Sequence, residues 1–118
     1  MKMEKITVNI LKDEWWWGVS CVVMLNNGKG IAEVQLDEST PNLAYIRGLS
    51  VHPDIRRKGV GRQLLLICQE IALSSGCKFC QLHVEKDKDW LVRWYESMGY
   101  VKIGIDDHNF TMLWSSQN

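Results

Sequence analysis

The sequence predicts a mixed α/β fold, a sheet with two main helices, in one domain spanning residues 1–118. Several segments of strand length before residue 52 either alternate apolar with polar residues or are continuously apolar. The period then changes to helical spacing over Val60–Ala72, and again over Asp89–Met98. Because 118 residues fit one domain, and no repeat or long linker divides them, we expect a single core.

Turn signals separate the expected strands. Asn27-Gly28 favours positive φ and predicts a hairpin, and Gly76 suits a left-handed stop after the first helix. A strand, a helix and a strand in succession imply one parallel pair with a right-handed crossover. The strands are expected at Ile6–Ile10, Trp16–Leu25, Ile31–Asp37, Leu43–Val51, Phe79–Val84, Tyr100–Ile105 and Phe110–Trp114.

Charge and apolar patterning exclude several classes of protein. Lys+Arg and Asp+Glu are equal at 14 each, so no net charge attracts nucleic acid or an anionic membrane. No apolar run approaches the roughly 20 residues that span a bilayer, and the first residues lack the apolar stretch of a signal peptide. We therefore expect a cytoplasmic protein with no nucleic-acid partner and no membrane partner.

The four cysteines are expected to be buried thiols that act as small apolar side chains. Cys77 and Cys80 have CxxC spacing, but a structural zinc site needs a second ligand pair of similar spacing. Cys21 lies in a strand-like run and Cys68 in a helical one. The sequence therefore predicts no metal site.

The most informative stretch joins the strand that ends near Val51 to the first long helix. Gly59 and Gly61 stand where that helix begins, and glycine lets the backbone approach a bulky anion while the free N–H groups of the first turn point at it. Four cations surround the point and add donors for phosphate. They are Arg56, Arg57, Lys58 and Arg62. The stretch predicts a phosphate-binding turn, the alternative being a solvated basic loop.

Two other phosphate loops fit this stretch less well. A Walker loop needs Gly-Lys-Ser/Thr, but Gly61 is followed by Arg62-Gln63. A dinucleotide-binding fingerprint needs a third glycine where Leu64 stands.

Two motifs in order resemble those of the GNAT superfamily of N-acetyltransferases. Arg56-x-x-Gly59-x-Gly61 resembles its Gln/Arg-x-x-Gly-x-Gly/Ala motif, and the strand Leu49–Pro53 resembles the one that leads into it. Trp94–Tyr100 is similar to the second signature, an aromatic-rich helix end followed by Gly-Phe or Gly-Tyr. The resemblance covers the chain from about Leu43 to the C-terminus.

The resemblance implies a fold and an activity. The fold is a mostly antiparallel sheet whose one parallel strand pair splays apart. The activity is transfer of an acetyl group from acetyl-CoA to a primary amine of a small molecule or peptide, by direct attack on the thioester. The coenzyme's pyrophosphate is expected on the backbone N–H groups of residues 57–62, and its pantetheine arm along the preceding strand. The coenzyme-binding residues implied are Leu49, Ser50, Val51, Arg56, Arg57, Lys58, Gly59, Val60, Gly61 and Arg62.

The catalytic residues implied are Val51 and Tyr95. The backbone N–H of Val51, or of a near neighbour, faces the acyl oxygen. Tyr95 matches the tyrosine that protonates the leaving sulfur, and a phenol pKa near 10 lies only a unit or two above a thiol pKa near 8.5. The alternative for Tyr95 is core packing. Many relatives carry a glutamate base on the strand before the turn, and this strand has none. The candidates left open for the base are Glu33, Asp37, Glu38 and His83.

Two further departures from the family pattern stand out. Lys88 takes the place of an asparagine near the coenzyme, and either Asp87 or Asp89 is expected to cap the following helix. The chain has no room for the two helices that usually follow the first strand, so the acceptor side is expected to be open or completed by a second copy in a homodimer. Trp15-Trp16-Trp17 is interpreted as a core or dimer contact, or as lining the acceptor site.

Two other functions compete with the enzyme. One is a catalytically inactive acyl-CoA-binding module that keeps the phosphate turn without a base. The other, a nucleic-acid-binding protein that uses the basic cluster, is weaker, because no aromatic residues interleave with the cations.

Overall fold

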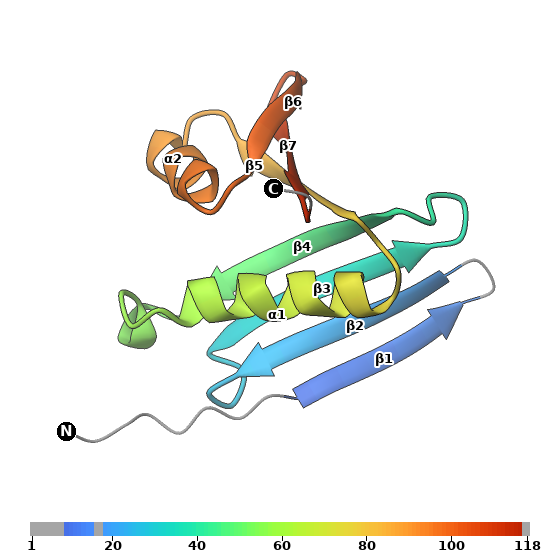
Figure 1. Ribbon diagram of the computed structural model, residues 1–118. Coiled ribbons are helices and arrows are strands. Elements are labelled where there is room, and N and C mark those ends of the chain that lie inside the picture. Colours follow the sequence, from blue (N-terminus) through green and yellow to red (C-terminus); the bar gives the residue numbers. More distant parts are fainter. Residues whose placement is uncertain (1–8, 16–17, 117–118) are drawn as a thin grey trace.

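The computed structural model describes residues 9–15 and 18–116, with side chains from residue 18 onward. One seven-stranded sheet in the order β1-β2-β3-β4-β5-β7-β6 forms the body of the protein (Figure 1). The strands are β1 (Asn9–Trp15), β2 (Gly18–Leu25), β3 (Gly30–Asp37), β4 (Leu43–Val51), β5 (Phe79–Glu85), β6 (Val101–Ile105) and β7 (Asn109–Ser115). The helices are η1 (Pro53–Ile55), α1 (Val60–Ser74) and α2 (Asp89–Ser97).

The predicted fold class is confirmed, and the first hairpin is the main correction. β1 continues to Trp15, where a strand over Ile6–Ile10 was predicted, and Trp15 pairs with Gly18. β2 is described from Gly18, where the predicted strand began at Trp16, because an apolar run alone does not reveal where one strand ends and the next begins. Residues 1–8 and 16–17 lie outside the described residues, as do the side chains of the predicted Trp15–Trp17 contact.

The β4–β5 pair is parallel, and it splays as predicted. Its ladder runs only from Leu43–Phe79 to Tyr45–Gln81. Beyond that point β4 continues over residues 46–51 and β5 over residues 82–85 without pairing to each other. All the other strand pairs are antiparallel. The two strands therefore bound an opening in the middle of the sheet.

Both long helices lie on one face of the sheet. Cys68 of α1 and Tyr95 of α2 belong to the same buried cluster as Leu82 and Val84 of β5. In Figure 1, α1 crosses in front of the strands, and α2 is drawn above the N-terminal part of α1. Within residues 9–15 and 18–116 no helix covers the other face, and only two residues separate β1 from β2. The prediction that two helices are missing there is confirmed.

Burial corrects one detail of α2. Helical spacing from Asp89 to Met98 brings Trp90 near Leu91 and Trp94, but Trp90 is 69% exposed. Val92 and Tyr95 form the buried face. The four cysteines are free and buried, as predicted. No helix in the part of the chain that the structure describes is long and apolar enough to span a membrane.

A close approach between β3 and α1 fixes the helix against the sheet. A Cβ placed on Gly30 would lie 2.7 Å from Cγ1 of Val60 and 3.2 Å from Cδ1 of Leu64. Gly30 pairs with Val51, the last residue of β4. The absence of a side chain at Gly30 therefore lets the first turns of α1 lie directly on the ends of both strands.

We expect Gly30→Ala to lower the free energy of unfolding by about 1–3 kcal/mol, because the new methyl overlaps Val60 and forces α1 away from the sheet. Urea denaturation measures this change. Gly104→Ala is the matched control, since its Cβ would meet Thr111 at an ordinary 3.6 Å. Equal stability of the two variants would contradict this account of Gly30.

Candidate active site

The turn before α1 has the backbone of an anion-binding loop. Arg57 has φ +66° and Gly59, the residue before the helix, has φ +78°. No side chain caps the first turn of α1. A left-handed residue other than glycine costs of order 1–3 kcal/mol and is typical of ligand clamps. Because Gly59 has no side chain to cap the helix, the backbone N–H groups of the first turn of α1 receive no acceptor from it.

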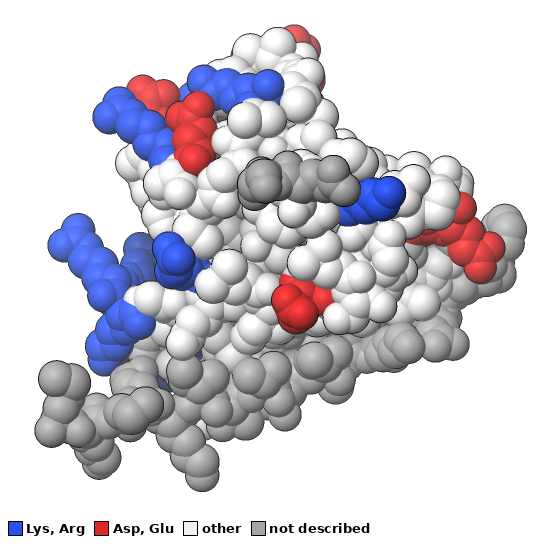
Figure 2. Space-filling view, viewed as in Figure 1, with Lys and Arg blue, Asp and Glu red and all other residues white. Residues whose placement is uncertain are grey.

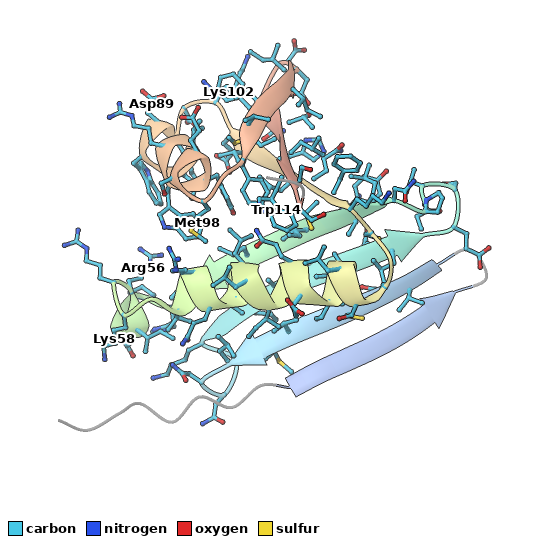
Figure 3. All side chains as sticks on the ribbon, viewed as in Figure 1. Arg56, Lys58, Asp89, Met98, Lys102 and Trp114 are labelled. Carbon is cyan, nitrogen blue, oxygen red and sulfur yellow. The ribbon has the colours of Figure 1, made fainter. Side chains whose placement is uncertain are left out.

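Basic side chains surround this turn. Figure 2 shows them gathered over the end of the molecule where α1 begins, and Figure 3 labels Arg56 and Lys58 among them. Arg56, Arg57 and Lys58 are exposed. Arg62 donates from Nη1 to Sδ of Met98 at 3.5 Å, which ties the first turn of α1 to the end of α2. The structure thus brings the predicted phosphate-binding residues together at one helix start.

Arg56 makes a contact that sequence reasoning missed. Its Nε donates a hydrogen bond to the backbone carbonyl of Val51 at 3.1 Å, and its backbone N–H donates to the carbonyl of Pro53 at 3.4 Å. The first cation of the motif therefore braces the end of β4. No pattern in the sequence marks this contact, because a side chain that bonds a carbonyl needs no particular partner residue.

Gly61 lies where three elements meet. A Cβ there would stand 3.6 Å from Cγ2 of Val51 and 3.7 Å from the ring atoms Cη2 and Cζ2 of Trp94. These are ordinary contact distances, so alanine fits, and a longer side chain would have to pass between Val51 and Trp94 or displace them. The walls of the site next to the turn are thus the end of β4, α1 and the indole of Trp94.

A β-bulge breaks β4 where it borders the opening. Arg47 pairs with Glu33 and Ser50 with Ile31, so Ala32 alone faces both Gly48 and Leu49. Gly48 has φ +62°, the conformation that such an insertion requires. Backbone groups of Gly48 and Leu49 therefore leave the regular ladder, next to the predicted donor Val51.

Tyr95 lies inside the core beneath α2, and only 6% of it is exposed. Its ring contacts those of Trp94 and Tyr100, with centroids 5.0 and 5.6 Å away. Its hydroxyl has no hydrogen-bond partner among the described residues, whereas that of Tyr100 accepts from Nε2 of Gln69 at 2.8 Å. Tyr100 is satisfied within the core, and Tyr95 keeps a free donor.

Burial raises the pKa of Tyr95 to about 12, with the nearby Cys68 thiol as a smaller cause. The sequence suggested a phenol pKa only a unit or two above that of a thiol. The gap is larger in the folded protein, because the buried phenolate loses its hydration. Tyr95 is therefore protonated throughout neutral pH, so its hydroxyl is available to donate a hydrogen bond.

The four candidate bases lie in different places. Asp37 is seven residues from Gly30, and thus about 23 Å along β3 from the end that pairs with Val51. Hydrogen bonds from Ser39 lower the pKa of Asp37, and Glu38 follows it at the same end. Glu33 accepts a hydrogen bond from the hydroxyl of Ser20.

His83 has a different setting from the carboxylates. It lies on β5 two residues past the last β4–β5 pair, at the edge of the opening. It is exposed, whereas Leu82 and Val84 on either side are buried under the helices, so its side chain projects from the helix-free face. Its Nδ1 lies 3.2 Å from Oγ1 of Thr111, which leaves Nε2 clear of that contact.

The predicted cap of α2 is wrong. Lys88 occupies the position before the helix, without a side-chain cap, so neither Asp87 nor Asp89 caps it. The Nζ of Lys88 lies 3.4 Å from Oε1 of Glu85 instead. This exposed ion pair keeps Lys88 beside the end of β5.

Comparison with known proteins places the chain in a family. The profile of the Acetyltransferase (GNAT) family matches residues 3–100, and the chain belongs to that family. It is 31% identical over 96 residues to the S-(2-succino)cysteine N-acetyltransferase of Bacillus subtilis (strain 168), covering 75% of this chain and 58% of the relative. The chain thus spans little more than half the length of that relative.

Solved structures share the fold. Nourseothricin acetyltransferase superposes with a TM-score of 0.71 at 22% identity, covering 83% of this chain and 65% of that one. The PaiA N-acetyltransferase of Thermoplasma acidophilum, solved in complex with coenzyme A, gives a TM-score of 0.71 at 21% identity, covering 84% and 61%. The predicted superfamily and fold are confirmed.

We expect Gly61→Glu to weaken coenzyme A binding by at least about 100-fold, because it adds a negative charge at the second residue of α1, beside the turn, and repels phosphate. Isothermal titration calorimetry measures the affinity. Gly61→Ala is the control and should bind normally, since its methyl meets Val51 and Trp94 at contact distance. Unchanged affinity in Gly61→Glu would show that the phosphates bind elsewhere.

Proposed function

We propose that the protein is an N-acetyltransferase that moves an acetyl group from acetyl-CoA to a primary amine of a small molecule or peptide. One observation carries the proposal: a strained, uncapped turn at the start of α1, ringed by cations, stands beside the end of a splayed strand. Family membership supports acetyl-CoA as the donor.

The residues present fit the donor. In the proposal, the backbone N–H groups from Arg57 to Arg62 hold the pyrophosphate, with the surrounding cations neutralising its charge. The pantetheine arm lies along β4 over Leu49, Ser50 and Val51, where β5 has moved away. The N–H groups of the bulge and of Val51 supply the donor for the acyl oxygen.

The acceptor approaches from the helix-free face in this proposal. Its neutral nitrogen attacks the carbonyl carbon of the thioester, forming the N–C bond as the C–S bond breaks. His83 projects from that face at the edge of the opening and accepts the proton that the amine releases. Asp37 and Glu38 are too distant for this role, and Glu33, which accepts a bond from Ser20 but keeps other lone pairs, is the second candidate base.

Tyr95 serves the leaving group from the helix-covered face. Its unpartnered hydroxyl donates a hydrogen bond to the sulfur as negative charge develops there. Because its pKa of about 12 lies well above that of a thiol, it stabilises the thiolate by hydrogen bonding more than by complete proton transfer.

Acceptor-dependent release of free thiol from acetyl-CoA tests the proposal. The first compounds to screen are small amino-acid derivatives, since the Bacillus subtilis relative is named for S-(2-succino)cysteine. Peptides and polyamines complete the panel. Coenzyme binding without turnover on any of them would instead support the inactive acyl-CoA-binding module.

Replacing His83 tests the base. We expect His83→Gln to lower kcat by about 100-fold or more with coenzyme affinity unchanged, because glutamine keeps a hydrogen bond to Thr111 but cannot take up a proton. Steady-state kinetics with a fixed acceptor measures the loss. His108→Gln, on the β6–β7 loop, is the control, and equal activity of the two variants would remove His83 from the mechanism.

The two buried tyrosines give a second test. We expect Tyr95→Phe to lower kcat by about 100-fold while the ring contacts and the stability are kept. Tyr100→Phe should keep kcat but lower the unfolding free energy by about 1–3 kcal/mol, because it leaves the buried amide of Gln69 without its hydrogen-bond acceptor. Thiol release and urea denaturation separate the two effects. Full activity in Tyr95→Phe would mean that Tyr95 serves only to pack the core.

A further inference from the structure

Arg56, a residue of the phosphate turn, also contacts the end of β4. Its Nε donates to the carbonyl of Val51 at 3.1 Å. The same peptide unit is held from its other side, where the N–H of His52 donates to the carbonyl of Lys29 at 2.6 Å. Arg56 is thus one of two braces on the peptide that ends β4.

The guanidinium has donors left over for a second partner. It is planar and carries five N–H donors, and the bond to Val51 uses the one on Nε. The two terminal nitrogens face other directions in a fixed fork, the geometry that matches phosphate oxygens. In Figure 3 Arg56 lies beside the first turn of α1, where the phosphates are proposed to bind.

We infer that Arg56 is a positioning residue that couples phosphate binding to the shape of the acyl site. Phosphate oxygens hold the terminal nitrogens, the rigid fork fixes the direction of Nε, and Nε fixes the carbonyl of Val51. This orders the segment from Gly48 to Val51, which includes the bulge. The inference rests on the proposed function, because that segment matters through the acyl oxygen it binds.

Arg57 provides the contrast within the same loop. It has the same charge and is also exposed, but no described residue accepts a hydrogen bond from its side chain. Losing Arg57 therefore removes charge without releasing β4. Arg56→Lys keeps the charge but loses the fork, since one ammonium group cannot bond Val51 and the phosphates in the geometry of a planar guanidinium.

The first experiment needs no turnover. Adenosine 3′-phosphate 5′-diphosphate, the phosphate-bearing half of coenzyme A, is titrated into ¹⁵N-labelled protein, and the amides of Leu49 and Val51 are followed by NMR. We expect large shifts at saturation in the wild type and in Arg57→Lys. In Arg56→Lys, with binding verified by calorimetry, we expect these two shifts to be largely lost. Full shifts in Arg56→Lys would overturn the inference.

The second experiment measures the coupling through the reaction. With S-acetylpantetheine, a donor that lacks phosphates, the wild-type kcat should rise about tenfold when the same nucleotide is added in trans. Arg57→Lys should need a higher nucleotide concentration but reach the same rise in kcat. Arg56→Lys should show no rise in kcat. An equal rise in kcat for Arg56→Lys would contradict the coupling. If the wild-type protein fails to use acetyl-CoA, the proposed function is wrong. The NMR shifts would still test the role of Arg56 in ordering β4.

Discussion

The packing of the first turn of α1 against the ends of β3 and β4 is the constraint on which the site depends. Gly30 lets Val60 approach to a distance that no side chain would allow, and Gly61 meets Val51 at ordinary contact. These contacts set the strained turn beside the splayed strand. Moving the helix by the width of a methyl group would separate the proposed phosphate site from the proposed acyl site.

The sheet has two unlike faces, and the proposed chemistry uses both. The helices bury one face and bring Tyr95 beneath α2, next to the opening between β4 and β5. Over the described residues the other face has no helix, because β1 turns almost directly into β2. A donor held by α1 therefore leaves its thioester open to an acceptor from the uncovered side, where His83 projects.

Much of this arrangement could be predicted from the sequence, because it rests on local rules. Helical periodicity located α1 and α2, and Asn27-Gly28 located a hairpin because few residues adopt positive φ. Packing decided the rest. Val101 and Ile105 look like core residues but are more than half exposed, since β6 is the edge strand of the sheet. The bond from Arg56 to Val51 joins a side chain to a carbonyl and leaves no trace in a residue pattern.

In the proposed mechanism the donor Tyr95 and the base His83 lie on opposite faces of the sheet, and this separation lets a buried tyrosine serve catalysis. If Tyr95 and His83 lay within hydrogen-bonding reach, the phenol would donate to the imidazole instead of to the sulfur. Burial under the helices raises the pKa of the phenol to about 12 and keeps its proton in place, while His83 is exposed beside Thr111. The proposed mechanism thus takes up the proton of the amine on one face and donates the hydrogen bond to sulfur from the other, on either side of the splayed strands.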